Sequence, residues 1–168
     1  MKHFFIGIDP GRKGGIVSLT NGKITTISKM PYNFLDMKGY FTDDLAIPRM
    51  DKEYVHVFIE NVHSRPTDGV RAAFTFGYHV GQLDGILDML GVSVDRVNPA
   101  TWMESFELKK SKEETKYFWK KRIMEFAKTK TTKEQASKIT LDTADAFLIA
   151  LYGYHKFKEK QCTSNQST

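Results

Sequence analysis

Four carboxylates stand in or directly beside apolar runs of this sequence, where an unpaired charge is unfavourable. Asp9 follows the run FFIGI, and Glu60 follows VHVFI. Asp142 and Asp145 lie three residues apart in the C-terminal run LDTADAFLIALYG. A buried carboxylate destabilises the fold unless something neutralises it. Convergent carboxylates are most often neutralised by divalent metal ions, so the four acids predict a metal site.

The donor types at this predicted site narrow the choice of metal. Carboxylate oxygens suit hard ions such as Mg²⁺, with Mn²⁺ as a substitute, and the single cysteine, Cys162, lies in a polar segment. Two such ions can activate a water and stabilise the leaving oxygen in phosphodiester hydrolysis. We therefore expect two ions per site, with Asp9 bridging both, Glu60 holding one, and Asp142 and Asp145 completing the ligand set.

A purely structural interpretation of the same acids stays open at this point. Asp142 is also a good residue for the N-cap or first turn of a helix, where the helix dipole favours a negative charge. Asp9-Pro10-Gly11 is also an ordinary turn sequence, because Pro and Gly both favour turns. Glu60 is harder to explain in this way, because it ends a strongly apolar run.

The elements that must position these acids can be predicted from the apolar pattern. Asn21-Gly22 between two β-rich runs is a strong hairpin signal, because both residues tolerate positive φ. We expect an α/β fold with a five-stranded mixed sheet, flanked by helices, in which strands 1–3 form an antiparallel meander. The expected strands are 3–8, 16–20, 23–29, 54–59 and 92–97, and the expected helices are a short one at 42–47, then 69–90, one within 109–133, and 141–156.

Glycines recur every four residues in the predicted helix 69–90. They are Gly77, Gly81 and Gly85, and apolar residues such as Val70 and Phe74 stand at helical spacing before them. A glycine lowers helix propensity by about 1 kcal/mol. The repeat therefore indicates close packing of this helix against another element.

The length and composition are those of one globular domain. The chain has 168 residues and a net charge of +5. We expect a single nuclease domain over residues 1–157 and a polar, disordered tail over residues 158–168. No run approaches the roughly 20 apolar residues of a membrane span. The expected location is the cytoplasm, which would be that of the host if the gene comes from a phage.

Basic residues are concentrated between Lys109 and Lys133, where ten Lys and Arg face three Glu. Such a stretch can contact nucleic-acid phosphates independently of sequence, although a solvated helix face has the same composition. Loop residues near the acids can grip the same strand, and ordinary loop charges are the alternative. The expected DNA-contacting residues are Arg12, Lys13, His63, Arg65, Lys109, Lys110, Lys112, Lys116 and Lys120.

Three motifs carry a family resemblance. FIGIDPGRKGG, FIENV and LDTADAFLIALYG occur in the order and nearly the spacing of the acidic motifs of RuvC-type Holliday junction resolvases, so the chain resembles a divergent member over residues 4–155. The resemblance implies an RNase H-like fold and Mg²⁺-dependent cleavage of four-way DNA junctions by paired nicks. It also implies that Asp9, Glu60, Asp142 and Asp145 are the catalytic acids. A homodimer formed through the helix 69–90 is a further implication.

Two positions depart from the family pattern. His63 stands where the bacterial enzymes carry an aromatic residue, and Met103 stands where they carry a lysine. Lys116 matches a second functional lysine of the family and is therefore counted among the catalytic residues, and Lys109 and Lys110 can take over from the missing one. These departures predict relaxed specificity towards several branched DNAs.

Other functions compete with junction resolution. A related nuclease acting on flaps or RNA–DNA hybrids would use the same metal chemistry. A sugar-kinase or actin-like phosphate-binding protein also opens with a strand, an Asp and a Gly-rich turn, but that fold needs two such domains. A non-catalytic DNA-binding module would be expected to have lost some of the four acids. The sequence identifies no branch-migration motor as a partner.

Overall fold

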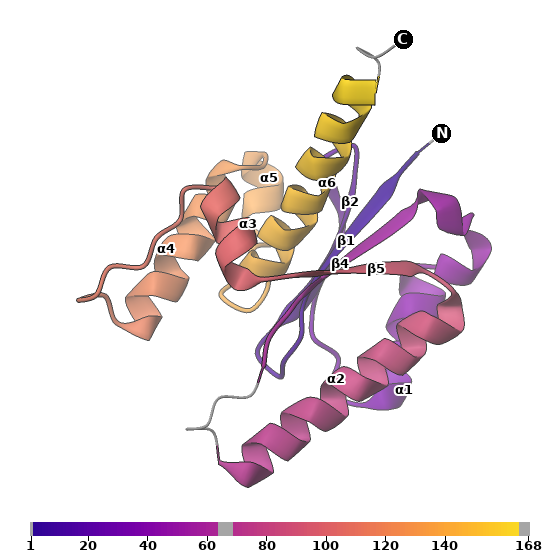
Figure 1. Ribbon diagram of the computed structural model, residues 1–168, viewed down its shortest axis with the longest axis horizontal. Helices are drawn as coiled ribbons and strands as arrows, with labels where there is room; N and C mark the ends of the chain where they lie inside the picture. Colours follow the sequence, from indigo (N-terminus) through magenta and orange to yellow (C-terminus); the bar gives the residue numbers. More distant parts are fainter. Residues whose placement is uncertain (1, 64–68, 165–168) are drawn as a thin grey trace.

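Five strands form one mixed sheet in the order β3-β2-β1-β4-β5 (Figure 1). A computed structural model of the protein describes residues 2–63 and 69–164. The α/β fold expected from the sequence is confirmed. The strands are β1 (Phe4–Asp9), β2 (Gly15–Thr20), β3 (Lys23–Lys29), β4 (Val55–Glu60) and β5 (Ser93–Val97).

The first three strands form the predicted antiparallel meander. β1 pairs with β2 and β2 with β3 in antiparallel register, whereas β4 lies parallel to both β1 and β5. Asn21 and Gly22 join β2 to β3 with φ values of 52° and 74°. Both residues therefore adopt the left-handed conformation that a tight hairpin requires.

Helices cover both faces of the sheet (Figure 1). α3, α4, α5 and α6 lie on one face, and α1 and α2 lie on the other. None of the helices within the described residues is both long and apolar enough to cross a membrane. The helices are α1 (Phe34–Gly39), α2 (Val70–Leu90), α3 (Pro99–Ser105), α4 (Lys116–Thr129), α5 (Lys133–Ala136) and α6 (Ala144–Ser164).

Alternation along β1 divides the core into two layers. Phe5 belongs to a cluster with Phe58 of β4 and Phe147 of α6. Ile6 instead packs in a second cluster that includes Leu83 of α2. Successive side chains of a strand point to opposite faces, so odd positions of β1 face α6 and even positions face α2.

Helix α6 lies directly on the backbone of β1 at Gly7. A Cβ built on Gly7 would lie 2.1 Å from the carbonyl oxygen of Ala146 and 2.3 Å from the backbone nitrogen of Ala150. Any side chain at this position would push the helix away from the sheet. The glycine thus sets the height of α6 above the strand, and it brings the beginning of the helix to the end of β1 that carries Asp9.

Most predicted boundaries differ from the observed ones by one to three residues, and two segments differ by more. α6 extends to Ser164, into the segment from 158 where we expected a disordered tail, and residues 165–168 lie outside the described residues. Phe157 helps to hold this extension, because its ring packs against those of His3 and Phe5. The predicted helix 42–47 is replaced by α1 and a π-helical turn over Tyr40–Asp44. Asn33 places the start earlier, because its side chain accepts a hydrogen bond from the Asp36 backbone N–H.

Only the second half of α2 packs against the sheet. Its buried residues are Leu83, Ile86, Leu87 and Leu90. Val70 and Phe74 are 87% and 74% exposed, although their spacing suggested a core position. No described residue lies within 4 Å of a Cβ built on any glycine of the repeat at 77, 81 and 85. The close packing predicted for these glycines is therefore not formed within the described part of the chain.

Candidate functional site

Asp9 and Glu60 end adjacent parallel strands. The register pairs Gly7 with Phe58 and Ile8 with Ile59, so the next positions along β1 and β4 are the two acids. Each acid lies two positions beyond a residue that faces α6, Gly7 in β1 and Phe58 in β4, and side chains alternate along a strand. The two carboxylates therefore lie side by side at one edge of the sheet, as the sequence predicted for neighbouring strands.

The two C-terminal acids occupy different positions around this edge. Asp145 lies in the first turn of α6, and its side chain is only 6% exposed. Asp142 precedes the helix, in the turn before Ala144, and its carboxylate forms an ion pair of 2.9 Å with Lys29. The two acids were expected to share a helix face. In the structure Asp145 is inside the cluster and Asp142 is at its rim.

Lys120 of α4 lies inside the acid cluster. Its ammonium forms a direct ion pair with the Asp145 carboxylate, and it lies 3.8 Å from Asp9 Oδ2. The sequence placed Lys120 among residues of a basic DNA-binding face. In the structure its ammonium faces two of the predicted metal ligands, and its contact with DNA stays a prediction.

Trp102 of α3 holds Glu60 in place. The indole Nε1–H donates a hydrogen bond of 2.9 Å to Glu60 Oε1, and the Trp102 side chain is fully buried. A donor to a buried carboxylate stabilises its charged form and fixes its orientation. Trp102 therefore positions one of the two strand-end acids.

The cluster carries more negative charge than its cation balances. Burial, followed by the charge of Asp145, raises the pKa of Asp9 from 3.8 to about 7, even though Lys120 opposes the shift. Burial also raises the pKa of Glu60, against the effect of the Trp102 hydrogen bond. Burial alone would lower the pKa of Lys120, but the charges of Asp145 and Asp9 raise it. An additional cation would relieve this imbalance.

The acids fit a divalent metal by donor type and by charge. All the oxygens are hard ligands, and Asp145 Oδ1 is buried with no hydrogen-bond partner among the described residues. Within the same residues, no three His, Cys, Asp or Glu side chains are already arranged to hold one ion. The positions of Lys120 and Asp142 give a reason, because one ammonium lies between Asp9 and Asp145 and another draws Asp142 outward.

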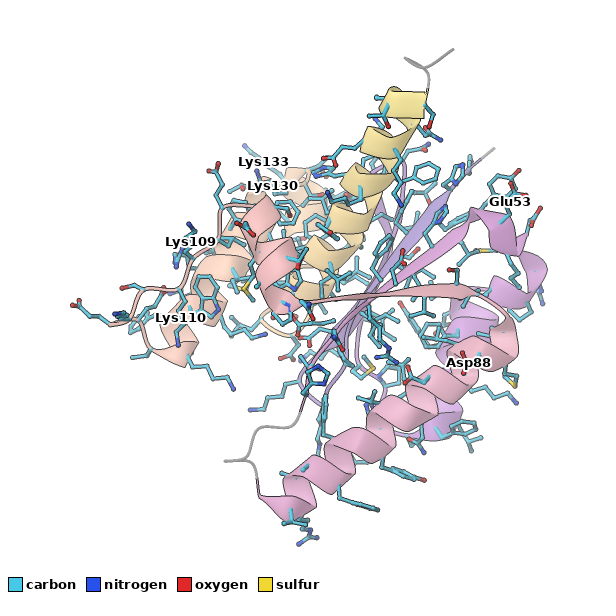
Figure 2. All side chains as sticks on the ribbon, viewed as in Figure 1. Glu53, Asp88, Lys109, Lys110, Lys130 and Lys133 are labelled. Carbon is cyan, nitrogen blue, oxygen red and sulfur yellow. The ribbon has the colours of Figure 1, made fainter. Side chains whose placement is uncertain are left out.

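The predicted DNA-contacting residues are dispersed over loops and the start of α4. Lys116 is exposed, one helical turn before Lys120. Arg65 lies outside the described residues. Figure 2 shows Lys109 and Lys110 on the loop before α4, at the opposite side of the molecule from Asp88. The other predicted contacts, all exposed, are Arg12, Lys13, His63 and Lys112.

Arg122 of α4 holds the basic loop that precedes this helix. Arg122 donates hydrogen bonds to both carboxylate oxygens of Glu114, at 3.0 and 2.9 Å, and to the Lys109 carbonyl at 2.7 Å. The Arg122 guanidinium also stacks 4.6 Å from the centre of the Trp119 ring. The backbone that carries Lys109 and Lys110 is therefore tied to a buried residue of α4.

A groove of about 1100 Å³ lies between α1 and the exposed half of α2. Gly11 and Arg12, from the turn after Asp9, line one end of it, and α1 and α2 supply most of the remaining wall. The Arg12 guanidinium lies 4.8 Å from the centre of the Tyr32 ring. The groove is thus formed mainly by α1 and α2, and only the turn after Asp9 links it to the strand that carries an acid.

Sequence reasoning missed two roles in this site. Nothing in the sequence neighbourhood of Trp102 indicates a hydrogen bond to Glu60. Lys120 had a usable signal, because it is enclosed on its helix by Trp119 and Ile123, which are both buried. A lysine between two core positions of an amphipathic helix lies at the edge of the buried face, where its ammonium can reach an internal partner.

Comparison with known proteins identifies the fold. The chain is similar to a solved structure of T. thermophilus RuvC in complex with a Holliday junction substrate, with a TM-score of 0.59 and 17% identity over 96% of this chain and 97% of that one. A second Thermus thermophilus RuvC structure matches with a TM-score of 0.50 and 14% identity over 89% of this chain and 91% of that one. No family model and no curated protein matches the sequence. At this level of identity the likeness establishes a RuvC-like fold for the chain.

Proposed function

We propose that this protein is a metal-dependent endonuclease that resolves four-way DNA junctions by paired phosphodiester hydrolysis. The observation that carries the proposal is the gathering of Asp9, Glu60 and Asp145 at one sheet edge beneath α6. One carboxylate oxygen there, Asp145 Oδ1, is buried and has no hydrogen-bond partner in the described part of the chain. The proposal is supported by the RuvC-like fold, because the similar T. thermophilus RuvC structure is a complex with a Holliday junction substrate.

Each acid has a distinct part in the proposed site. Asp9 is close enough to Asp145 and Glu60 for the charges of both to raise its pKa, and it is therefore the acid that we assign to both ions. Asp142 would complete the ligand set once it leaves Lys29. Bound Mg²⁺ or Mn²⁺, two ions per site, would supply an activated water and stabilise the leaving oxygen. Trp102 keeps Glu60 oriented throughout.

The DNA-binding surface proposed here begins at the acids and extends along the basic loop. Lys116 is one helical turn from Lys120, so it can bind a phosphate next to the scissile one. Lys109 and Lys110 extend the positive surface outward on a loop that Arg122 holds in position. Contacts of this kind bind phosphates without reading sequence. Selection of a junction must then come from DNA shape.

Paired cleavage needs two active sites, and we propose that a homodimer provides them. Val70, Phe74 and Tyr78 of α2 are exposed, and the glycines at 77, 81 and 85 leave open space along the same stripe of the helix. Exposed apolar stripes of this kind mark interaction sites. A second copy could approach closely at the glycines and cover the aromatic rings.

The dimer can be tested with a matched pair of variants. Gly81→Glu places a charge in the stripe, whereas Gly81→Ala leaves it small and uncharged. We expect a dimer for the wild type and for Gly81→Ala, but a monomer for Gly81→Glu, by size-exclusion chromatography with light scattering. Gly81→Glu should also convert paired nicks into single nicks. A monomeric wild type would contradict the proposed dimer.

The activity is tested by a cleavage assay with purified protein and Mg²⁺ or Mn²⁺. The substrates are a four-way junction, a three-way fork, a flap, an RNA–DNA hybrid and a linear duplex of the same arm sequence. We expect symmetric paired nicks on the four-way junction, weaker cutting of the other branched DNAs, and none of the linear duplex.

Other results would identify a different enzyme. Preferred cutting of the flap or the hybrid would favour the alternative RNase H-like nuclease. Equal cutting of linear duplex and junction would contradict junction resolution. Chelation with EDTA should stop all cleavage, and activity that survives EDTA would remove the metal from the proposal.

A further inference from the structure

Lys120 occupies its place in the acid cluster because of how α4 packs. Trp119 and Ile123 are buried on either side of it and fix the rotation of the helix, while Lys121 points to solvent. The Lys120 side chain is 32% exposed, and its ammonium contacts Asp145 and faces Asp9 at 3.8 Å. The contact therefore follows from the core of the protein and not from a freely moving surface chain.

The Lys120 ammonium is shared by two carboxylates, and both stabilise its positive charge. It is close to both Asp9 and Asp145, which come from different elements, β1 and α6. The lysine contacts Asp145 Oδ2, and Oδ1 has no hydrogen-bond partner within residues 2–63 and 69–164. One positive charge thus satisfies the cluster in part, and the remaining negative charge still favours a cation of higher charge.

A divalent ion and an ammonium cannot share this space. A magnesium ion that joins Asp9 to Asp145 would have to contact oxygens at about 2.0–2.1 Å, and those oxygens now face the Lys120 ammonium. Two cations a few ångströms apart repel strongly in a partly buried site. One of them must leave before the other can bind.

We propose that Lys120 is a built-in competitor of the metal: its ammonium holds Asp9 and Asp145 when no metal is bound, and it must withdraw before the metal can bind. This inference rests on the metal site of the proposed function and adds a control on its occupancy. The long side chain reaches solvent, so it can turn outward to a DNA phosphate near Lys116. Bound DNA would then favour metal binding, and bound metal would favour DNA.

The test measures Mn²⁺ binding by isothermal titration calorimetry on the DNA-free protein. Lys120→Met and Lys120→Gln remove the competing charge, Lys120→Arg keeps it, and Lys121→Met removes an exposed charge from the same helix. We expect the two neutral variants to bind Mn²⁺ at least about tenfold more tightly than the wild type. Lys120→Arg and Lys121→Met should bind Mn²⁺ as weakly as the wild type does.

A second readout needs no metal binding at all. In EDTA the two neutral variants should melt at a lower temperature than Lys121→Met, because the acids lose their internal cation. Unchanged Mn²⁺ affinity in both neutral variants, or weaker binding, would overturn the proposal for Lys120. If that result came with cleavage that depends on Asp9 and Mg²⁺, the proposed function would stand. A lack of Mn²⁺ binding by the wild type and all variants would overturn both.

Discussion

The two faces of the sheet differ in how completely the chain covers them. On the α6 face the helix touches the strand backbone at Gly7, and core residues fill the layer from β1 to α4. On the opposite face, α2 packs against the sheet through its second half only, and Figure 1 shows the first half of this helix extending beyond the sheet. The first face is completed within one chain, whereas the second presents apolar side chains that no described residue covers fully.

What each face lacks is also different. The α6 face buries charge, and its acids need a cation. The α2 face exposes rings such as Phe74, which need apolar contact. An excess of buried charge is relieved by a metal or an ammonium, and an exposed apolar stripe is relieved by another protein surface. The proposed metal site and the proposed dimer surface therefore lie on different faces of the sheet.

The largest expected effect comes from removing the carboxylate of Asp9 from the acid cluster on the α6 face. Asp9→Asn should abolish cleavage while leaving junction binding largely intact, because the DNA contacts come from other residues. Single-turnover cleavage and gel-shift measurements with the same four-way junction test both parts. Asp84→Asn is the control, since Asp84 pairs with Arg96 away from the site. Retained cleavage by Asp9→Asn would exclude the proposed metal chemistry.

The same variant should raise the stability of the metal-free protein above neutral pH. Because the pKa of Asp9 is raised to about 7, the folded state binds more protons than the unfolded state between about pH 4 and pH 7. Stability from this group therefore falls as pH rises through that window. Asparagine removes the penalty, so Asp9→Asn should gain roughly 2–4 kcal/mol at pH 8 in EDTA and little at pH 4. Urea unfolding at the two pH values measures the difference.

A pair of identical substitutions tests the difference in packing between the faces. Gly7→Ala forces a Cβ into the backbone of α6, and we expect it to destabilise the fold by about 3 kcal/mol or more. Within one chain Gly81→Ala meets no described side chain, so in protein diluted until it is monomeric we expect it to stabilise the helix by about 0.5–1 kcal/mol. Urea unfolding at one protein concentration measures both. Effects of the same sign would show that the faces are packed alike.

Local sequence patterns were sufficient for the parts of the molecule that depend on neighbouring residues. Asn21-Gly22 predicted the hairpin because positive φ is a property of those residue types. Asp9 and Glu60 could be placed together because each ends an apolar strand, and adjacent parallel strands end at one edge. Predicting that these two acids lie together thus required only the ends of the two strands and the knowledge that the strands pair.

Contacts between distant elements were beyond the sequence. Periodicity marked Phe74 as apolar and helical, but it does not say whether the covering surface belongs to the same chain. Lys120 was one lysine in a stretch of ten basic residues. Its position between two core residues of its helix hinted at an internal partner, but only the packing of α4 on α6 identifies that partner. Trp102 needed the approach of α3 to the end of β4. Such contacts depend on how whole helices dock, which a single sequence does not encode locally.

The smallest expected effect concerns the residue that orients an acid of the α6 face without being a ligand. Trp102→Phe keeps an aromatic ring but leaves Glu60 Oε1 without its donor. The hydrogen bond favours the charged form, so its loss should raise the pKa of Glu60 further. A protonated Glu60 cannot bind metal, and the acidic limb of the pH–rate profile should therefore move to higher pH. At pH 7 we expect about tenfold slower cleavage, in line with one hydrogen bond to a charged group.

Trp119→Phe is the matched control for this prediction. It removes the same N–H group from the same core cluster, but its ring stacks with Arg122, away from Glu60. We expect the position of its acidic limb to match that of the wild type, even if the rate falls because Trp119 also helps to hold Lys120 and the basic loop. If both tryptophan variants shift the acidic limb equally, the effect comes from loosened core packing. A shift confined to Trp102→Phe would show that a single buried hydrogen-bond donor sets the pKa of Glu60 on the α6 face. The exposed stripe of α2 carries no charge, so no substitution there should move the acidic limb in this way.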